Sequence, residues 1–114
     1  MISAVLYRNE GRLTGFRASG HSGYAEAGSD IVCSGVSALS ITCVNAMESL
    51  LGVVVSPRVD ENTGLLSFEL PDVPEDRESG VQLLMGALGE GLTAMQESYP
   101  GYVKFEIRER RKSP

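Results

Sequence analysis

The sequence predicts a single α+β domain with the element order ββαββαβ, in which an antiparallel or mixed sheet carries two helices packed on one face. The chain has 114 residues and is 42% hydrophobic, which suits one compact domain with a single core. Five short runs of β-favouring residues occur in the order two, two and one along the chain. They are separated by two longer segments whose apolar residues recur every three or four positions, as in helices that pack on a sheet.

The first hairpin and the first helix lie in the first half of the chain. Strands near residues 2–8 and 12–19 flank a segment with Asn and Gly at 9–11, which favours a hairpin turn. The helix that follows has Asp30 or Ser29 as its N-cap and Gly52 just past its end. Its apolar stripe consists of Val32, Val36, Leu39, Cys43, Met47 and Leu50.

The second half of the chain repeats the hairpin and the helix and adds a strand. Residues 53–60 and 65–70 predict the hairpin, and Pro57 indicates an edge strand or a bend because proline cannot donate to a ladder. Prolines and acids at 71–80 predict the start of the second helix. The final strand is expected at 102–109, with alternate side chains inward. The inward positions are Val103, Phe105 and Ile107, and the second helical stripe is Val81, Leu84, Met85, Leu88, Leu92 and Met95.

The net charge and the hydropathy of the sequence limit the kinds of partner that the protein is expected to bind. The net charge is −5, so the whole molecule lacks the basic footprint of a nucleic-acid-binding protein. Residues 108–114 form a basic C-terminal tail with the sequence RERRK at 108–112, which we interpret as a solvated end. No apolar run reaches the roughly 18 residues that span a bilayer, and the N-terminus lacks the pattern of a signal peptide. We therefore expect no membrane partner and a cytoplasmic location.

The two cysteines are expected to be free thiols. Cys33 and Cys43 lie ten residues apart on the predicted helix, which separates them by about 15 Å along its axis, too far for a disulfide. One histidine and two distant cysteines also make a poor metal site, because structural zinc needs about four converging ligands. Cys43 lies near the middle of the apolar stripe, where its simplest role is that of a small buried hydrophobe.

Cys33 lies on the flank of that stripe and needs another explanation. If Asp30 is the N-cap, Cys33 is the third helical residue, where backbone N–H groups lack intrahelical partners and the helix dipole is positive. Such a position favours the thiolate, which is the nucleophilic form. The same N–H groups could receive the oxyanion of a tetrahedral intermediate.

His21 is the only histidine of the chain, and it closes the second predicted strand. A chain that leaves this strand, makes a loop and enters the helix at the same end of the sheet can bring His21 and Cys33 together. An imidazole beside a thiol forms an ion pair and can later protonate a leaving amine, which is the chemistry of a cysteine protease dyad. From chemistry alone, an inert Cys33 and a surface His21 stay open as the alternative, because a Cys–His pair is a weak signal.

The segment GHSGYAEAGSDIVCSGVSAL, residues 20–39, resembles the signature of the ribosomal-processing cysteine protease family (Prp). The predicted element order also agrees with that family along the whole chain. Ser22, Ser34 and Gly35 stand where members commonly carry alanines, and Gly35 could loosen the first helical turn. The matching positions are Gly20, His21, Gly28, Asp30, Ile31, Val32, Cys33, Val36 and Ser37.

The resemblance implies both a reaction and roles for residues. It implies an endopeptidase that removes a short N-terminal extension from large-subunit ribosomal protein number twenty-seven and that works as a homodimer; no cofactor is expected. Cys33 corresponds to the nucleophile and His21 to the general base and acid. Asp30 could orient the imidazole or cap the helix, and Ser37 could form a hydrogen bond within the site.

The loop at 22–29 is expected to be mobile and to serve the substrate. Its small residues and glycines would let it open for an extended peptide and close over it, excluding water. Tyr24 is the one bulky side chain there, and it either touches the substrate or packs the loop down. The residues assigned to this loop function are Ser22, Gly23, Tyr24 and Gly28.

Two other classes of function stay open. A non-catalytic, dimeric, ribosome-associated binding module would use residues 108–112 against RNA phosphates, and its binding would weaken steeply with salt and survive Cys33→Ala. A thiol redox sensor would show reversible oxidation of Cys33 without peptide cleavage. The protease interpretation instead predicts cleavage that disappears in Cys33→Ala and His21→Ala while the fold remains.

Overall fold

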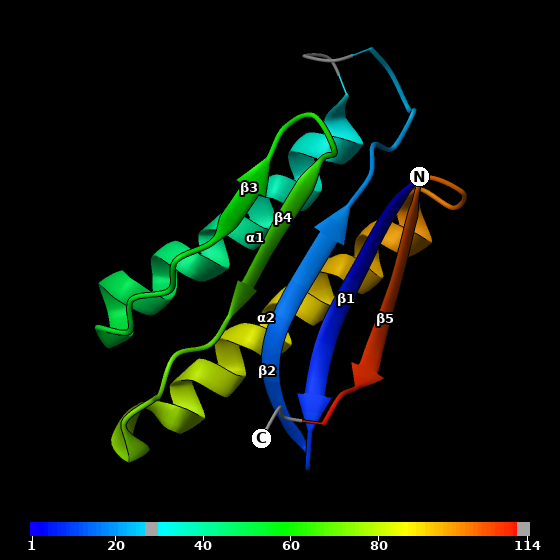
Figure 1. Ribbon diagram of the computed structural model, residues 1–114. Helices are drawn as coiled ribbons and strands as arrows, with labels where there is room; N and C mark the ends of the chain where they lie inside the picture. Colours follow the sequence, from blue (N-terminus) through cyan, green and yellow to red (C-terminus); the bar gives the residue numbers. More distant parts are fainter. Residues whose placement is uncertain (27–29, 112–114) are drawn as a thin grey trace.

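The structure, a computed structural model, describes residues 1–26 and 30–111. Within these ranges, five strands form one mixed sheet in the order β3-β4-β2-β1-β5. Both long helices cover the same face of the sheet, and the opposite face carries no helix (Figure 1). The predicted fold class and the element order ββαββαβ are confirmed.

The strands and helices follow one another along the chain in the predicted order. The strands are β1 (Ile2–Asn9), β2 (Arg12–Ser19), β3 (Arg58–Asp60), β4 (Leu65–Glu69) and β5 (Val103–Glu109). The helices are α1 (Ile31–Leu51) and α2 (Glu78–Ser98), and the short 3-10 helix η1 (Glu75–Arg77) precedes α2. β1 pairs with β2 in the antiparallel direction and with β5 in the parallel direction, which makes the sheet mixed.

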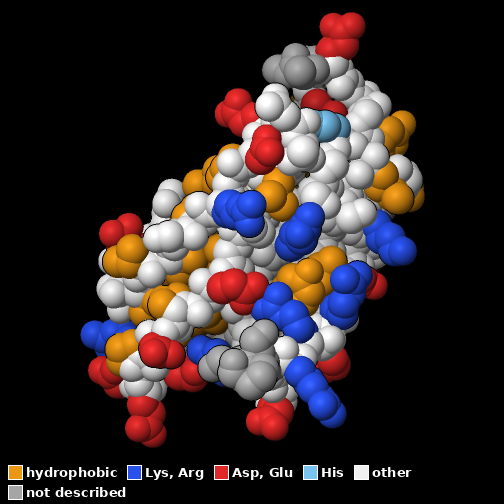
Figure 2. Space-filling view, viewed as in Figure 1, with side chains coloured by type: hydrophobic (Ala, Val, Ile, Leu, Met, Phe, Trp, Pro, Cys, Tyr) orange, Lys and Arg blue, Asp and Glu red, His pale blue; other side chains and the backbone are white. Residues whose placement is uncertain are grey.

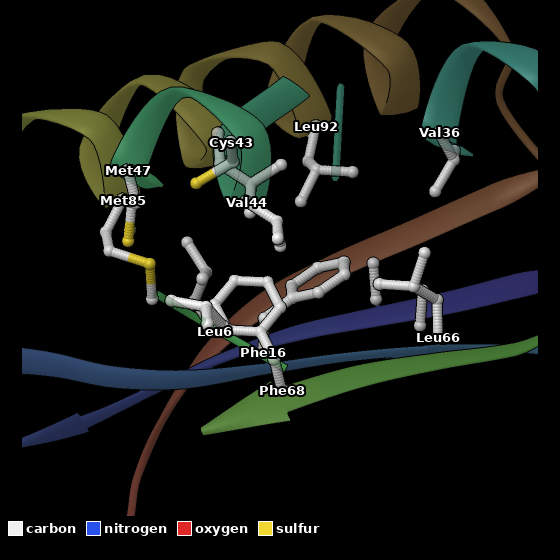
Figure 3. Close-up of a cluster of buried hydrophobic side chains, with 14 of the residues drawn as sticks. Leu6, Phe16, Val36, Cys43, Val44, Met47, Leu66, Phe68, Met85 and Leu92 are labelled. Carbon is white, nitrogen blue, oxygen red and sulfur yellow. The ribbon is translucent and has the colours of Figure 1, made fainter. Parts of the chain in front are cut away.

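The hydrophobic core fills the layer between the sheet and the helices (Figure 3). Phe16 and Phe68 contribute adjacent rings from neighbouring strands, with centroids 5.6 Å apart. Met47 of α1 and Met85 of α2 are fully buried above them. Cys43 is buried in the same layer as a free thiol, and burial raises its pKa to about 11. Both cysteines are free thiols, as predicted.

Two predicted inward side chains are exposed instead. Leu50 is 72% exposed because the last turn of α1 projects past the strands (Figure 1). Ile107 is 45% exposed because β5 is an edge strand, and the contact of α2 with it is made nearer its start, where Gln96 accepts from the amide of Phe105. In α1, the buried Ser40 satisfies its hydroxyl by donating to the carbonyl of Val36 at 2.7 Å.

The third predicted strand is much shorter than its apolar pattern indicates. β3 covers Arg58–Asp60 only, whereas the sequence predicts a strand over 53–60. Val53 and Val55 are buried in the core, so their hydrophobicity reflects packing and not a ladder. Pro57 ends the unpaired stretch, because proline offers no N–H to the neighbouring strand.

Glycines in the two helices allow neighbouring side chains to pack closely against the helix backbone. A Cβ on Gly89 would lie 3.1 Å from a methyl of Leu6 in the sheet, and one on Gly91 would lie 2.7 Å from Leu39 of α1. Gly35 admits the Met95 side chain in the same way, because a Cβ on Gly35 would lie 2.8 Å from the Met95 methyl. Gly35 therefore stands at a helix contact, within an α1 that is helical from its first turn.

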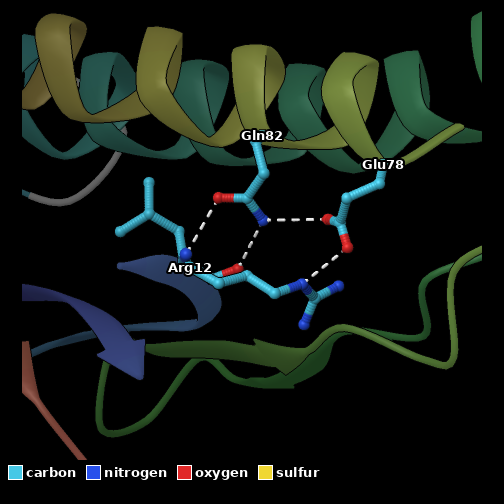
Figure 4. A network of polar contacts seen from close by, with 4 residues as sticks. Arg12, Glu78 and Gln82 are labelled. Carbon is cyan, nitrogen blue, oxygen red and sulfur yellow. Dashed lines mark hydrogen bonds and ion pairs between the residues drawn. The ribbon is translucent and has the colours of Figure 1, made fainter. Parts of the chain in front are cut away.

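A polar network fixes the start of α2 to the first hairpin (Figure 4). The Gln82 side chain accepts from the backbone N–H of Leu13 at 2.9 Å and donates to the Leu13 carbonyl at 2.8 Å. Beside it, Arg12 pairs with Glu78 at 2.7 Å. The hydrogen bond from Arg12 holds the pKa of the Glu78 carboxyl below its usual value.

Helix α1 is long and apolar enough, by length and composition alone, to cross a membrane, with a mean hydropathy of 1.4. The prediction that no stretch reaches this length therefore needs qualification. In the structure this helix packs on the sheet through Val32, Val36 and Met47, all of which are buried. The buried side of α1 thus contributes apolar side chains to the core of the domain.

The basic tail is partly structured. β5 extends to Glu109, so the first residues of the predicted tail belong to the sheet. Arg108 forms an ion pair with Glu106, and Arg110 pairs with Glu69 at 2.6 Å while its guanidinium lies 3.9 Å from the ring centroid of Tyr7. Figure 2 shows Lys and Arg side chains over the face of the sheet that lacks helices. Residues 112–114 lie outside the described residues.

Candidate active site

Asp30 begins helix α1 and connects it to the preceding segment. Its Oδ1 accepts from the backbone N–H groups of Val32 and Cys33, each at 3.0 Å, and its Oδ2 accepts from the Ser22 hydroxyl. The hydrogen bond from Ser22, joined by backbone N–H donors that include Cys33, lowers the pKa of Asp30 to about 2 against the opposing effect of burial. The N-cap expected at Asp30 is confirmed, and Ser29, the other candidate, lies outside the described residues.

The Cys33 thiol lies in the first turn of α1 and is half-buried. The backbone N–H of Ser22 donates to its sulfur at 3.4 Å, and the Ser22 hydroxyl oxygen lies 3.6 Å from the sulfur. Ser22 thus contacts both the thiol and the capping carboxylate. The sequence predicts Ser22 as a loop residue for the substrate, and the structure places it against the sulfur.

Three backbone amides in the first turn of α1 are already occupied. The amides of Val32 and Cys33 bond the Asp30 carboxylate, and the amide of Ser34 bonds the Asp30 carbonyl at 3.1 Å. The oxyanion role of this turn stays a prediction, but in this structure these three donors are engaged by Asp30. The cause is the N-cap itself, because a capping carboxylate satisfies the same groups that an oxyanion would need.

His21 lies just beyond β2, which ends at Ser19 and not at the histidine. The imidazole is exposed, and it lies on the surface at the end of the molecule where β2 finishes (Figure 2). Its Nε2 is 3.3 Å from the backbone carbonyl oxygen of Asn62. The N-terminal ammonium of Met1 donates to the His21 carbonyl at 2.6 Å, so the backbone is held as well as the ring.

The thiol and the imidazole face one cavity of about 200 Å³ between α1 and the sheet. Within the described residues the two groups make no direct hydrogen bond; they share the cavity wall. Ser37, one turn beyond Cys33, is an exposed part of that wall, and its hydroxyl makes no hydrogen bond in the described part of the chain. The lining residues are Ile2, Ala18, Gly20, His21, Cys33, Val36, Ser37, Ser40, Glu61, Gly64 and Leu66.

The turn between β3 and β4 is a part of this site that the sequence analysis missed. It contributes Glu61 and Gly64 to the cavity and the Asn62 carbonyl to His21. The sequence ENTG does indicate a turn. Its position beside His21 follows from the pairing of β4 with β2, which no local sequence pattern shows.

In the described part of the 22–29 loop, Ser22 is buried and residues 23–26 are exposed. The Tyr24 ring makes edge-on contacts with the rings of Tyr99 and Tyr102, at centroid distances of 5.6 and 5.2 Å. Of the two interpretations of Tyr24, this geometry matches the one in which it packs the loop down. Gly23 has a φ of +71°, which suits glycine, and Gly28 lies outside the described residues.

A small α+β chain in which a thiol near a helix start and an imidazole share one cavity belongs to the class of candidate thiol-dependent hydrolases. Comparison with known families makes the assignment specific. Residues 1–104 match the family described as cysteine protease Prp. The chain therefore belongs to the cysteine protease Prp family, and the resemblance seen in residues 20–39 is confirmed.

Relatives from several bacteria support this assignment along nearly the whole chain. The ribosomal processing cysteine protease Prp of Bacillus subtilis (strain 168) is 33% identical over 102 residues, which is 87% of this chain and 90% of that protein. The crystal structure of SMU.848 from Streptococcus mutans has a TM-score of 0.84 at 37% identity and covers 96% of both chains. The ribosomal processing protease Prp of S. aureus, in complex with a covalently linked product peptide, has a TM-score of 0.83 at 28% identity, covering 95% of this chain and 100% of that one.

Proposed function

We propose that this chain is a cytoplasmic cysteine endopeptidase that removes the short N-terminal extension of large-subunit ribosomal protein number twenty-seven. The observation that carries the proposal is the cavity shared by His21 and Cys33 at the start of α1. The S. aureus relative is solved with a covalently linked product peptide, and the matched family is that of a cysteine protease, so the two together support a covalent step at a cysteine. The names of the relatives support a ribosomal substrate.

The chemistry follows from the two groups in the cavity. His21 takes the thiol proton while the Cys33 sulfur bonds to the scissile carbonyl carbon, and the C=O electron pair moves to oxygen. When that tetrahedral intermediate collapses, the C–N bond breaks and the imidazolium gives its proton to the leaving amine. A water molecule then attacks the thioester, with His21 again as base, and the thiol is regenerated. The amide of Ser22, 3.4 Å from the sulfur, stabilises negative charge on it before attack.

A cleavage assay with two matched cysteine variants tests this function. The substrate is the extension-bearing ribosomal protein, and mass spectrometry identifies the new N-terminus. We expect Cys33→Ala and His21→Ala to lose cleavage, and Cys43→Ala, which removes the buried thiol, to keep it. Cleavage that persists in folded Cys33→Ala would overturn the proposal.

We further propose that the enzyme is a homodimer, as the family resemblance implies. The outer side of the helix pair supports this, because it carries an apolar hollow of about 260 Å³ that includes Leu39, Leu84 and Ala87. Light scattering on the eluted peak of a sizing column should give twice the mass of one chain. Ala87→Glu should shift that mass toward the monomer, and a monomeric wild-type protein would contradict the proposal.

The binding-module alternative has less support in the structure. It relies on the basic run at 108–112, of which Arg108 and Arg110 already pair with carboxylates of the sheet. RNA binding that weakens steeply with salt and survives Cys33→Ala would favour it.

A further inference from the structure

We propose that the backbone carbonyl of Asn62 is the positioning group for His21 and fixes its tautomer with the proton on Nε2. This inference deepens the proposed function and rests on it, since it assigns the way the base is oriented. The contact is Nε2 to Asn62 O at 3.3 Å. A carbonyl oxygen only accepts hydrogen bonds, so this contact requires the proton on Nε2 and leaves Nδ1 as the basic nitrogen.

The carboxylate that could have held this place is engaged elsewhere. Asp30 accepts from two helix amides through Oδ1 and from the Ser22 hydroxyl through Oδ2. Within the described residues, no contact joins Asp30 to the imidazole. The structure thus divides the two roles that the sequence left open, with Asp30 on the helix and a main-chain carbonyl on the histidine.

The turn that carries this carbonyl is held tightly against the histidine segment. Gly20 donates its N–H to the carbonyl of Thr63 at 3.0 Å. Gly64 has a φ of +66°, and a Cβ there would collide with the Gly20 carbonyl oxygen and lie 3.2 Å from Cε1 of His21. Inside the turn, Asp60 Oδ1 accepts from the N–H of Asn62 at 3.0 Å. These contacts place the Asn62 carbonyl without help from its own side chain.

The tautomer decides which nitrogen can act on the thiol. With Nε2–H bound to the carbonyl, Nδ1 holds the lone pair that takes the proton from Cys33 when sulfur bonds to the scissile carbon. The resulting imidazolium keeps its Nε2–H on the carbonyl and returns the Nδ1 proton to the leaving amine as the C–N bond breaks. Asn62 therefore acts through His21 and does not touch the substrate.

Nitrogen-15 NMR of the single histidine tests the tautomer without any substrate. At about pH 9, where an imidazole is neutral, we expect one pyrrole-like signal from Nε2 and one pyridine-like signal from Nδ1. These signals would show that nearly all molecules hold the Nε2–H tautomer. In Gly64→Ala, which pushes the turn away, we expect a tautomer mixture and a roughly 100-fold fall in kcat with a smaller change in KM. Gly11→Ala is the matched control, because Gly11 also has positive φ but would place its Cβ in open space.

A milder pair of variants covers the case in which Gly64→Ala does not fold. Asp60→Ala removes the acceptor for the Asn62 amide, so it should weaken the preference for the Nε2–H tautomer and lower kcat. Asp60→Asn, whose amide oxygen can still accept, should keep both the tautomer preference and kcat near the wild-type values. A predominant Nδ1–H tautomer in the wild-type protein overturns the inference. So does an unchanged tautomer and kcat in folded Asp60→Ala and Gly64→Ala.

The experiments distinguish a failure of the positioning role of Asn62 from a failure of the proposed protease function. Cleavage that depends on Cys33, together with a tautomer mixture in the wild-type protein, overturns the positioning role alone. A locked Nε2–H tautomer, together with cleavage that survives Cys33→Ala, overturns the proposed function.

Discussion

At the scale of single residues, Asp30 shows how one carboxylate determines what its neighbours can do. It caps α1 and binds the Ser22 hydroxyl, so it takes up the helix amides and places Ser22 against the Cys33 sulfur. The sequence predicted the cap because an Asp before an apolar stripe is a common helix start. The partner of Oδ2 could not be predicted, because Ser22 lies eight residues away in a loop without periodicity.

The lowered pKa of Asp30 predicts a loss of stability in acid. The folded protein holds this pKa at about 2, against 3.8 for the free side chain, so the stabilisation is complete above about pH 4 and is lost as the pH falls toward 2. The melting temperature of Asp30→Asn, which keeps an acceptor oxygen, should fall less steeply than that of the wild type across this window. The exposed Asp72→Asn should keep the wild-type slope, and equal slopes for all three would contradict the assignment.

Cys43 predicts the opposite dependence in alkali. Its pKa rises from 9.0 to about 11 on burial, so between these values the unfolded chain loses a proton that the folded chain keeps. Stability should therefore fall as the pH rises from 9 to 11, by as much as ~3 kcal/mol. Denaturant unfolding should show this slope in the wild type and in Cys33→Ala, and a flatter slope in Cys43→Ala. An unchanged slope in Cys43→Ala would show that other groups cause it.

At the scale of elements, hydrophobic periodicity predicted both helices and the final strand β5, because each buries one side on the same core. Periodicity gave wrong predictions where a residue is buried without belonging to a strand, or is apolar without being buried. Val53 and Val55 are buried without belonging to a strand, and Leu50 continues the apolar stripe of α1 but its side chain is 72% exposed. A local pattern reports the hydrophobicity of a position and does not report whether a neighbouring element reaches it.

The packing of α2 can be tested by truncating one buried and one exposed leucine. Leu92 is fully buried, whereas Leu83 on the same helix is 75% exposed. Leu92→Ala should lower the free energy of unfolding by about 2–5 kcal/mol, because it removes core contacts and leaves a cavity. Leu83→Ala should change it by less than about 0.5 kcal/mol. Chemical denaturation measures both, and similar losses would mean that α2 is oriented differently.

At the scale of the whole molecule, the site is assembled from segments that lie far apart in the sequence. The strand order brings the turn after β3 beside the end of β2, and the Tyr24 ring reaches the segment between α2 and β5. The pair His21 and Cys33 could be inferred from a continuous stretch of twenty residues. Asn62, Glu61 and the tyrosine contacts could not, because they depend on the tertiary arrangement.

The tyrosine contacts predict a role in holding the loop. Each aromatic pair contributes about 0.5–1.5 kcal/mol, so Tyr24→Ala should lower kcat/KM by roughly tenfold, since the loop next to Cys33 loses both ring contacts. Tyr7→Ala, which removes a ring near the far end of β1, should leave kcat/KM unchanged among folded molecules. Steady-state kinetics on one peptide substrate would show the difference, and equal effects would argue against a specific role for Tyr24.

The most direct test of the account is to look for the covalent intermediate on Cys33. The enzyme is mixed with the extension-bearing substrate, quenched in acid within the first turnover, and its intact mass is measured, followed by mapping of the modified peptide. The account predicts a thioester adduct of the N-terminal fragment on Cys33 that is absent in Cys33→Ala and present in Cys43→Ala. An adduct on another residue, or cleavage by Cys33→Ala at the wild-type rate, would contradict it.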